Sequence, residues 1–363
     1  MSQLVEKFGR ENAWNEHIVL VNPLIEPLNE GFKKSSYNFI KALEASGVPM
    51  KVIQLGTFAD ILMVLFHLNL GNFACIHIIE SHTIMAPLLL KLRKIIRREK
   101  YTIIQYILSP IHCQDRIRNK ILRILTYLIS LVFSDIVITT SVNIKRKLSR
   151  CAHMLKRSIL LIPMPISTNK YEPPHHKWEG NKLRVLYIGE LGPFRFPEKV
   201  VLGFVSCLTK IIPMELTVVT ADFQWNYVYM KSFLKEVKDM GLLPHIKAKI
   251  KDLSETEKAE LYSQAHVFLF PALAPAAMDP PLTALESLSH GTPVILFSEY
   301  YLSLLNIPGT ISYIDFLRMS LNNAAYPILL QLKLVGLEGK RYVEETHTID
   351  SVAKILGKLV VLS

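Results

Sequence analysis

Residues 266–295 read HVFLFPALAPAAMDPPLTALESLSHGTPVI, and this stretch carries the clearest structural pattern in the chain. Its first apolar run predicts a buried strand. Pro280 and Pro281 suit the first turn of a helix, and Gly291 suits its end. The apolar run PVILF follows directly. A strand, a helix and a second strand in this order predict a parallel unit whose helix starts at the carboxyl edge of the sheet.

The same alternation runs through both halves of the chain. In the first half, strands are expected at 17–25, 49–56, 74–80, 101–108, 135–141 and 158–165, with a helix at 32–45 and helical patterns between the later strands. In the second half, strands are expected at 184–189, 215–220, 246–250, 266–272 and 293–297, with helices up to about 209, at 227–240, at 254–264 and from about 282. Residues 166–181, rich in Pro, Gly and His, predict a linker between the halves. We therefore expect an α/β protein with two doubly wound, Rossmann-like domains, at 1–168 and 182–345.

The length and the composition agree with two domains and restrict the class of protein. A chain of 363 residues can form two cores of ordinary size. The charged N-terminus does not resemble a secretory signal, and the apolar run at 124–134 is too short to span a membrane, so a cytoplasmic protein is expected. The four cysteines are tens of residues apart, which fits small buried side chains better than a zinc site or a disulfide framework.

The net positive charge of the chain comes entirely from its first half. The net charge is +11, and residues 1–168 hold 22 Lys and Arg against 11 Asp and Glu, whereas the rest of the chain holds 20 of each. Such an asymmetry indicates a polyanionic partner for the first half, either nucleic acid or anionic lipid.

The helix that starts near 282 suggests a binding site for a nucleotide. Its first free amides, those of Leu282 and Thr283, could hold a diphosphate with help from the helix dipole. Glu286, one turn further on, could accept hydrogen bonds from ribose hydroxyl groups. The alternative reading is a capped helix that carries a surface glutamate.

The stretch that contains Glu286 resembles the donor-site motif of family 4 glycosyltransferases, written E-x7-E. Glu286 matches the second glutamate, which in that family binds the donor ribose. The first glutamate is replaced by Met278, with Asp279 beside it. The similarity implies the GT-B fold, in which two Rossmann-like domains face a central cleft and a final helix, here 346–363, crosses back to the first domain.

Other segments resemble the same family in the same order. VLYIGELGPFRFPEKVVLGF, from Val185 on, resembles the first strand and loop of the donor domain. There Gly189 ends the strand, Glu190 stands where the family has an arginine, and Arg195 matches a lysine that neutralises the diphosphate. EGFKKSSYNFIKALEASGVPMKVI resembles the family's glycine-rich first loop, with Gly31 at the second glycine and Glu30 in place of the first. A solvated loop residue is the alternative for Arg195.

The resemblance implies a retaining hexosyltransferase that takes a UDP- or GDP-sugar as co-substrate and needs no metal and no other cofactor. Catalysis would rest on positioning and electrostatics, with departure of the leaving group ahead of attack on the same face of the sugar. A histidine often faces the donor sugar in this family. His112 is the candidate here, with His82 as the second choice, and a structural histidine is the alternative for either.

Two basic, apolar segments indicate the acceptor side. Lys91, Lys94 and Arg98 would share one helical face, and Arg116, Lys120 and Arg123 would share another beside large apolar residues. This composition is typical of helices that lie on a lipid surface, although a solvated face above a core is the alternative. The apolar neighbours disfavour nucleic acid. We expect a lipid-linked or other saccharide acceptor and a peripheral position on the cytoplasmic face of a membrane.

Two rival functions remain at this point. One is a sugar-nucleotide epimerase of the same fold, which would need carboxylates in the cleft that the pattern does not provide. The other is an inactive homologue that acts as a partner or scaffold, which the replacements at Met278 and Glu190 suggest.

Overall fold

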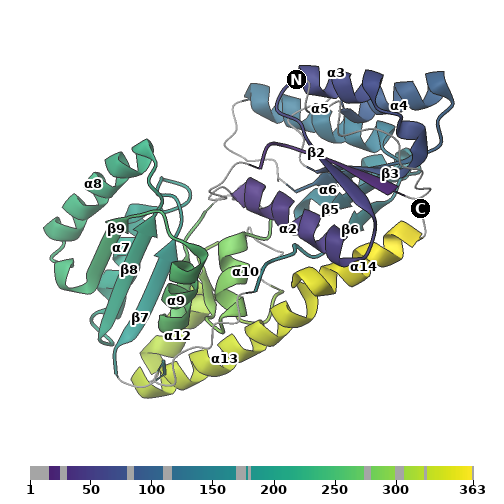
Figure 1. Cartoon of the computed structure of the whole chain (residues 1–363). Helices are drawn as coiled ribbons and strands as arrows, with labels where there is room; N and C mark the ends of the chain where they lie inside the picture. Colours follow the sequence, from purple (N-terminus) through teal and green to yellow (C-terminus); the bar gives the residue numbers. More distant parts are fainter. Residues whose placement is uncertain are drawn as a thin grey trace.

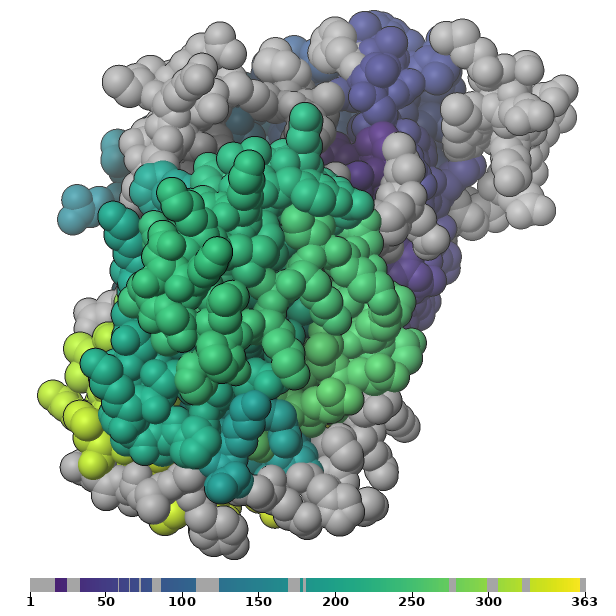
Figure 2. Space-filling view, turned by 90° about the vertical axis from the view of Figure 1, so that its left-hand side faces the viewer, coloured from purple at the N-terminus to yellow at the C-terminus, as the bar shows by residue number. Residues whose placement is uncertain are grey.

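The computed structural model describes residues 16–24, 31–79, 86–108, 117–168, 177–178, 181–273, 279–298, 306–322 and 325–361. Within these residues the chain forms two parallel sheets of six strands each, one from each half of the sequence (Figure 1). The expected α/β fold with two Rossmann-like domains is thereby confirmed. Figure 2 looks at the second domain from its outer side and shows the first domain behind its upper edge.

The first sheet has the strand order β2-β1-β3-β4-β5-β6. Its strands are β1 Glu16–Val21, β2 Met50–Gln54, β3 Phe73–Ile79, β4 Thr102–Ile107, β5 Ile136–Thr139 and β6 Ile159–Leu161, and its helices are α2 Gly31–Ala45, α3 Phe58–His67, α4 Ala86–Arg97, α5 Ile117–Phe133 and α6 Val142–Met154. Alternate residues of a strand point to opposite faces. Val19 and Val21 therefore pack on the side of α2, whereas Ile18 and Leu20 pack on the side of α3 and α4.

The second sheet has the order β12-β11-β10-β7-β8-β9. Its strands are β7 Leu183–Ile188, β8 Met214–Thr220, β9 Ile246–Ile250, β10 Val267–Phe270, β11 Val294–Leu296 and β12 Thr310–Ser312, and its helices are α7 Glu198–Leu208, α8 Gln224–Asp239, α9 Glu255–Gln264, α10 Leu282–Ser289, α12 Tyr313–Asn322 and α13 Ala325–Thr346. The strands and helices between 183 and 296 lie where the sequence pattern predicts them. The strand β12 and the long helix α13 lie beyond the last predicted strand.

The helix α13 packs closely against the end of α10 because glycines line the contact. A Cβ atom on Gly336 would lie 2.2 Å from the carbonyl oxygen of Gly291, and one on Gly339 would lie 2.9 Å from the Cα atom of Gly309. Both distances are far below van der Waals contact, so a larger residue at either position would push the helix away. This close contact with α13 fixes the position of the end of α10.

The last helix, α14 Ile349–Val361, returns to the first sheet and packs against α2 (Figure 1). Two segments cross between the domains side by side, since the amide of Ile166 donates to the carbonyl oxygen of His347 at 2.7 Å. Val352 and Leu356 of α14 belong to one continuous apolar cluster that also contains residues of α2, α9 and α10. The two sheets therefore share a core, which limits how far the domains can separate without exposing apolar surface.

This shared core predicts different costs for two neighbouring residues of α14. Leu356 is 1% exposed and Ile355 is 36% exposed. Because a buried cavity costs more than lost surface contact, Leu356→Ala should lower the free energy of unfolding by about 2–5 kcal/mol. Ile355→Ala should change it by less than about 1 kcal/mol. Urea denaturation of both variants measures the difference, and equal losses would contradict the packing of α14.

Candidate functional site

The strand order of the second sheet reverses direction between β7 and β10. The chain runs from β7 outward to β8 and β9 and then returns to place β10 on the other side of β7. Loops that follow β7 and β10 must therefore diverge, and ligands of open α/β sheets bind in the crevice between such loops. Gly189 and Arg195 follow β7, and Glu286 lies on the helix that follows β10. The topology thus places the loop that carries Gly189 and Arg195, and the helix that carries Glu286, after the two neighbouring strands β7 and β10.

The helix α10 begins at Leu282, as the paired prolines predict. Pro281 is its N-cap residue and provides no side-chain hydrogen bond to the first turn. The amides of Leu282 and Thr283 belong to the turn that has no partner within the helix. Leu282 is buried and Thr283 is half-buried, so this turn lies at the edge of the shared core. The arrangement can accept an anion, as the sequence suggests.

Asp279, just before α10, ties this region to the first domain. The residue is 2% exposed. Its carbonyl oxygen accepts a hydrogen bond from the hydroxyl of Thr140 at 2.8 Å, and its carboxylate accepts a short one from the hydroxyl of Ser141. Ser141 is also the N-cap of α6, because its Oγ accepts from the amide of Ile144. The start of α6 in the first domain therefore contacts the segment that leads into α10.

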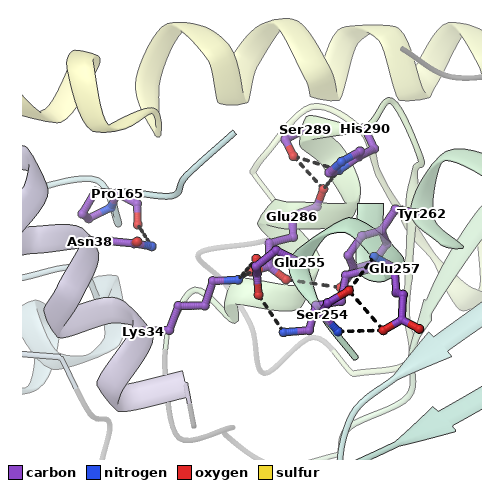
Figure 3. A network of polar contacts seen from close by, with 11 residues as sticks. Lys34, Asn38, Pro165, Ser254, Glu255, Glu257, Tyr262, Glu286, Ser289 and His290 are labelled. Atoms are coloured by element: carbon purple, nitrogen blue, oxygen red, sulfur yellow. Dashed lines mark hydrogen bonds and ion pairs between the residues drawn. The ribbon is translucent and has the colours of Figure 1, made fainter. Parts of the chain in front are cut away.

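An ionic cluster surrounds Glu286, in which Lys34 and Glu286 are largely buried and Glu255 is 53% exposed (Figure 3). The Nζ atom of Lys34, from α2 of the first domain, lies 2.5 Å from Oε1 of Glu286 and 2.6 Å from Oε2 of Glu255. The hydroxyl of Tyr262 lies 3.4 Å from Oε2 of Glu286. The side chain of Glu286 is only 10% exposed. The sequence does not indicate these partners, because Lys34 and Glu286 are 252 residues apart.

The surroundings determine which members of this cluster are charged. Burial by itself would lower the pKa of Lys34, but the charges of Glu286 and Glu255 outweigh it and raise the pKa. Burial would likewise raise the pKa of Glu255, and the charge of Lys34 reverses that effect and lowers it. Burial and the charge of Glu286 raise the pKa of Tyr262 well above its ordinary value, so its hydroxyl is a neutral donor. The cluster is a cation between carboxylates, with Tyr262 as an additional donor.

A small pocket opens beside the carboxylate of Glu286. Ser167, Lys258, Tyr262 and His290 are among its lining residues. The Nδ1–H of His290 donates to the carbonyl oxygen of Glu286 at 2.8 Å, and burial lowers the pKa of this histidine. Its Nε2 atom is then a buried acceptor, and it has no hydrogen-bond partner within the described part of the chain. Such an atom can accept a hydrogen bond from a ligand or a water molecule.

The loop after β7 presents Arg195 to solvent. A guanidinium nitrogen of Arg195 lies 2.5 Å from a carboxylate oxygen of Glu190, and the two side chains are 41% and 34% exposed. The hydroxyl of Tyr187 donates to the carbonyl oxygen of Glu190 at 2.6 Å. A Cβ atom on Gly189, directly after β7, would lie 2.8 Å from that hydroxyl, so a larger residue here would displace the side chain of Tyr187. Glu190 stands at the position where the sequence resemblance predicts an arginine, and it forms an ion pair with Arg195 in the same loop.

The remaining predicted residues lie at the edge of the described structure or outside it. Gly31 is the first residue of α2. His112, His82 and Met278 lie outside the described residues. No group of three or more His, Cys, Asp or Glu side chains that could hold a metal ion occurs among the residues that the structure describes.

The expected basic face of α4 requires a correction. The Nζ atoms of Lys91 and Lys94 lie 2.7 and 3.0 Å from the carboxylate of Asp135, so these cations neutralise a carboxylate instead of forming a free basic face. Arg98 lies beyond the end of α4 in a left-handed backbone conformation, with φ of 52°. Arg116 lies outside the described residues, and the side chains of Lys120 and Arg123 are not described.

Comparisons with known proteins agree on the fold. The sequence matches no family model and no curated protein. HepE from Anabaena, in a crystal structure with UDP, is 11% identical with a TM-score of 0.72, and the match covers 96% of this chain and 100% of HepE. Sucrose-phosphate synthase from Thermosynechococcus elongatus is 17% identical with a TM-score of 0.69, covering 96% of this chain and 99% of that one. The lipopolysaccharide outer core galactosyltransferase WaaB is 11% identical with a TM-score of 0.64, covering 96% and 100%. At these identities the likeness shows the fold, which is the GT-B arrangement of two Rossmann-like domains.

The contact between Ser141 and Asp279 can be tested by its effect on stability. Ser141→Ala removes a hydrogen bond to a buried carboxylate and the N-cap of α6, so it should lower the free energy of unfolding by about 2–4 kcal/mol. Ser149→Ala is the control, because the hydroxyl of Ser149 is exposed and donates within α6 to Arg146. The control should change stability by less than about 0.5 kcal/mol. Denaturant titration compares the two, and a Ser141 variant as stable as the control would contradict the contact.

Proposed function

We propose that this protein is a glycosyltransferase that moves a hexose from a nucleotide sugar to a saccharide acceptor. The observation that supports the proposal is that α10, with Glu286 in its second turn, follows β10 at the point where the strand order of the second sheet reverses. The first turn can hold a diphosphate, and the carboxylate one turn later can accept from ribose hydroxyl groups. HepE, which shares the fold, has been crystallised in complex with UDP and with UDP-glucose, which supports a nucleotide-sugar donor.

Arg195 is the proposed cation for the leaving diphosphate. Its partner Glu190 does not prevent this role, because an ion pair between exposed side chains contributes only about 0–1 kcal/mol. A diphosphate carries more charge than one carboxylate and can accept two parallel hydrogen bonds from the guanidinium. Donor binding would therefore draw Arg195 from Glu190 to the phosphates, where it stabilises the charge that develops on departure.

Glu286 is the proposed partner of the donor ribose. A carboxylate has about four acceptor positions, and in the structure Lys34 uses one on Oε1 while Tyr262 lies near Oε2. Positions for the two ribose hydroxyl groups therefore remain. The amides of Leu282 and Thr283 lie one turn closer to the amino end of α10, which suits the diphosphate next to the ribose.

The finer chemistry follows from the resemblance to family 4 enzymes. We propose retention of the anomeric configuration, a UDP- or GDP-sugar donor and no requirement for a metal ion in the chemical step. We propose that Gly31, at the start of α2, allows the backbone to approach the donor closely. We also propose that His112 contacts the donor sugar. A non-catalytic homologue is the rival, and the pairing of Arg195 with Glu190 is the observation that favours it.

The proposed acceptor is lipid-linked, and exposed apolar side chains on two helices of the first domain support a lipid partner. They lie on α4 and α5, two helices in mutual contact, and belong to Leu92, Ile95, Ile96, Ile124, Leu125, Leu128 and Val132. Ile95 and Ile96 are 65% and 78% exposed. Apolar surface of this kind beside Arg97, Arg98 and Lys100 fits a lipid interface better than open water. In the described part of the chain, no helix is both long and apolar enough to cross a bilayer.

Donor binding provides the first test of this function. Calorimetric titration with UDP, GDP and their glucose and mannose derivatives should find one base that binds the wild type. Because a hydrogen bond to a buried charge contributes about 1.5–3 kcal/mol, Glu286→Gln should weaken that binding about ten- to a hundredfold. Glu260→Gln, which changes an exposed carboxyl group on α9, is the control and should bind as the wild type does.

Transfer assays with isolated lipid-linked glycans then separate an enzyme from an inactive homologue. EDTA should leave transfer largely intact, and a strict need for Mn²⁺ or Mg²⁺ would count against the proposed mechanism. Binding of the donor without any transfer or hydrolysis would favour the non-catalytic rival.

The exposed apolar residues of α4 and α5 lead to a prediction about lipid binding. Ile95→Ser with Ile96→Ser should weaken sedimentation with vesicles of phosphatidylcholine and phosphatidylglycerol about tenfold or more, since two exposed apolar side chains are lost. Leu330→Ser with Leu334→Ser is the control, because these residues are 50% and 57% exposed on α13 of the second domain. Equal vesicle binding by both double variants and the wild type would leave a soluble glycan as the acceptor.

A further inference from the structure

Lys34 is a first-domain residue whose ammonium group pairs with two carboxylates of the second domain. It lies in the first turns of α2, and its side chain is 13% exposed. Its Nζ atom reaches across the cleft to Glu286 at 2.5 Å and to Glu255 at 2.6 Å (Figure 3). The two carboxylates come from different helices, α10 and α9. One cation therefore joins three helices from two domains at the proposed ribose position.

The surroundings of Lys34 make its position specific. A buried ammonium group is costly to desolvate, and the cost is recovered only with close, well-oriented partners. Lys258 gives Glu255 a second cation at 2.9 Å, whereas Lys34 is the cation that contacts Glu286 within the described residues. Without Lys34, Glu286 would face Glu255, and none of the described cations would contact Glu286. Like charges at close range repel, and Glu286 would then lose its orientation.

We propose that Lys34 is a positioning residue for the donor: it holds the carboxylate of Glu286 in its binding orientation and so couples donor affinity to the docking of the first domain. This inference rests on the proposed function, because it gives Lys34 its role through the ribose contact of Glu286. The acceptor positions left on that carboxylate allow Lys34 and a ribose to be bound together. Donor affinity is then highest when the two domains are docked. Separating the domains at this point breaks the contact of Glu286 with Lys34 and weakens its contact with the ribose.

The test removes the charge of Lys34 in two ways. Lys34→Met and Lys34→Gln should each weaken binding of UDP or GDP, whichever the wild type binds, by about tenfold or more. Lys34→Arg should retain more affinity than either, because it keeps a cation that can reach two carboxylates. Lys41→Met is the matched control on the same helix, since Lys41 is exposed and pairs with Glu44 at 2.7 Å. The control should bind the nucleotide as the wild type does.

A double-mutant cycle distinguishes positioning from a general loss of structure. If Lys34 acts through Glu286, adding Lys34→Met to Glu286→Gln should weaken nucleotide binding by less than about threefold, far less than the same change in the wild type. In the transfer assay, the KM for the nucleotide sugar should rise in Lys34→Gln while the KM for the acceptor stays unchanged. Thermal unfolding of every variant checks that it is folded.

The outcomes separate the inference from the proposed function. A wild type that binds none of the nucleotides would defeat the proposed function. A wild type that binds, with folded Lys34 variants that bind equally well, would overturn the inference alone. Equal losses from Lys34→Met in the wild type and in Glu286→Gln would also overturn it, because Lys34 would then act independently of Glu286.

Discussion

The ionic contact of Lys34 with Glu286 and Glu255 is the interaction on which the geometry of the cleft depends. It places one buried cation from the first domain between two carboxylates of the second, at distances of 2.5 and 2.6 Å. Removing one partner from such a cluster leaves an uncompensated buried charge, which is strongly unfavourable. The cluster therefore favours one relative position of α2 and α10, and the remaining contacts between the domains are compatible with that position.

Two other contacts support the same arrangement by different physical means. Ser141 and Thr140 bind Asp279 next to the start of α10 and fix the segment before this helix. The helix α14 returns to α2 and joins both domains in one apolar core, so separating the domains would expose buried side chains to water. Polar contacts thus orient the elements of the cleft, and apolar packing holds the two domains together.

The candidate site shows which parts of a binding site local sequence can reveal. The prolines before Leu282 and the glycine after His290 are local signals, and the helix between them begins and ends where they predict. Arg195 and Glu190 also lie in the loop that the sequence indicates, although their mutual ion pair depends on how that loop folds. The expected basic face of α4, in contrast, is corrected by the tertiary structure. The spacing of Lys91 and Lys94 describes a helical face correctly, but Asp135, on a distant part of the chain, takes up both cations.

The sequence by itself determined the alternation of strands and helices, the two-domain α/β architecture and the position of Glu286 on a helix at the edge of a sheet. These features depend on side chains within a few turns of one another, and hydrophobic periodicity records them directly. Only the tertiary structure decided that Lys34 meets Glu286, that Asp279 meets Ser141 and that α13 packs on Gly291. Partners so far apart in sequence are chosen by the packing of whole elements. No local pattern encodes that packing, because each lysine or aspartate satisfies the same helical or loop pattern whichever partner it finally contacts.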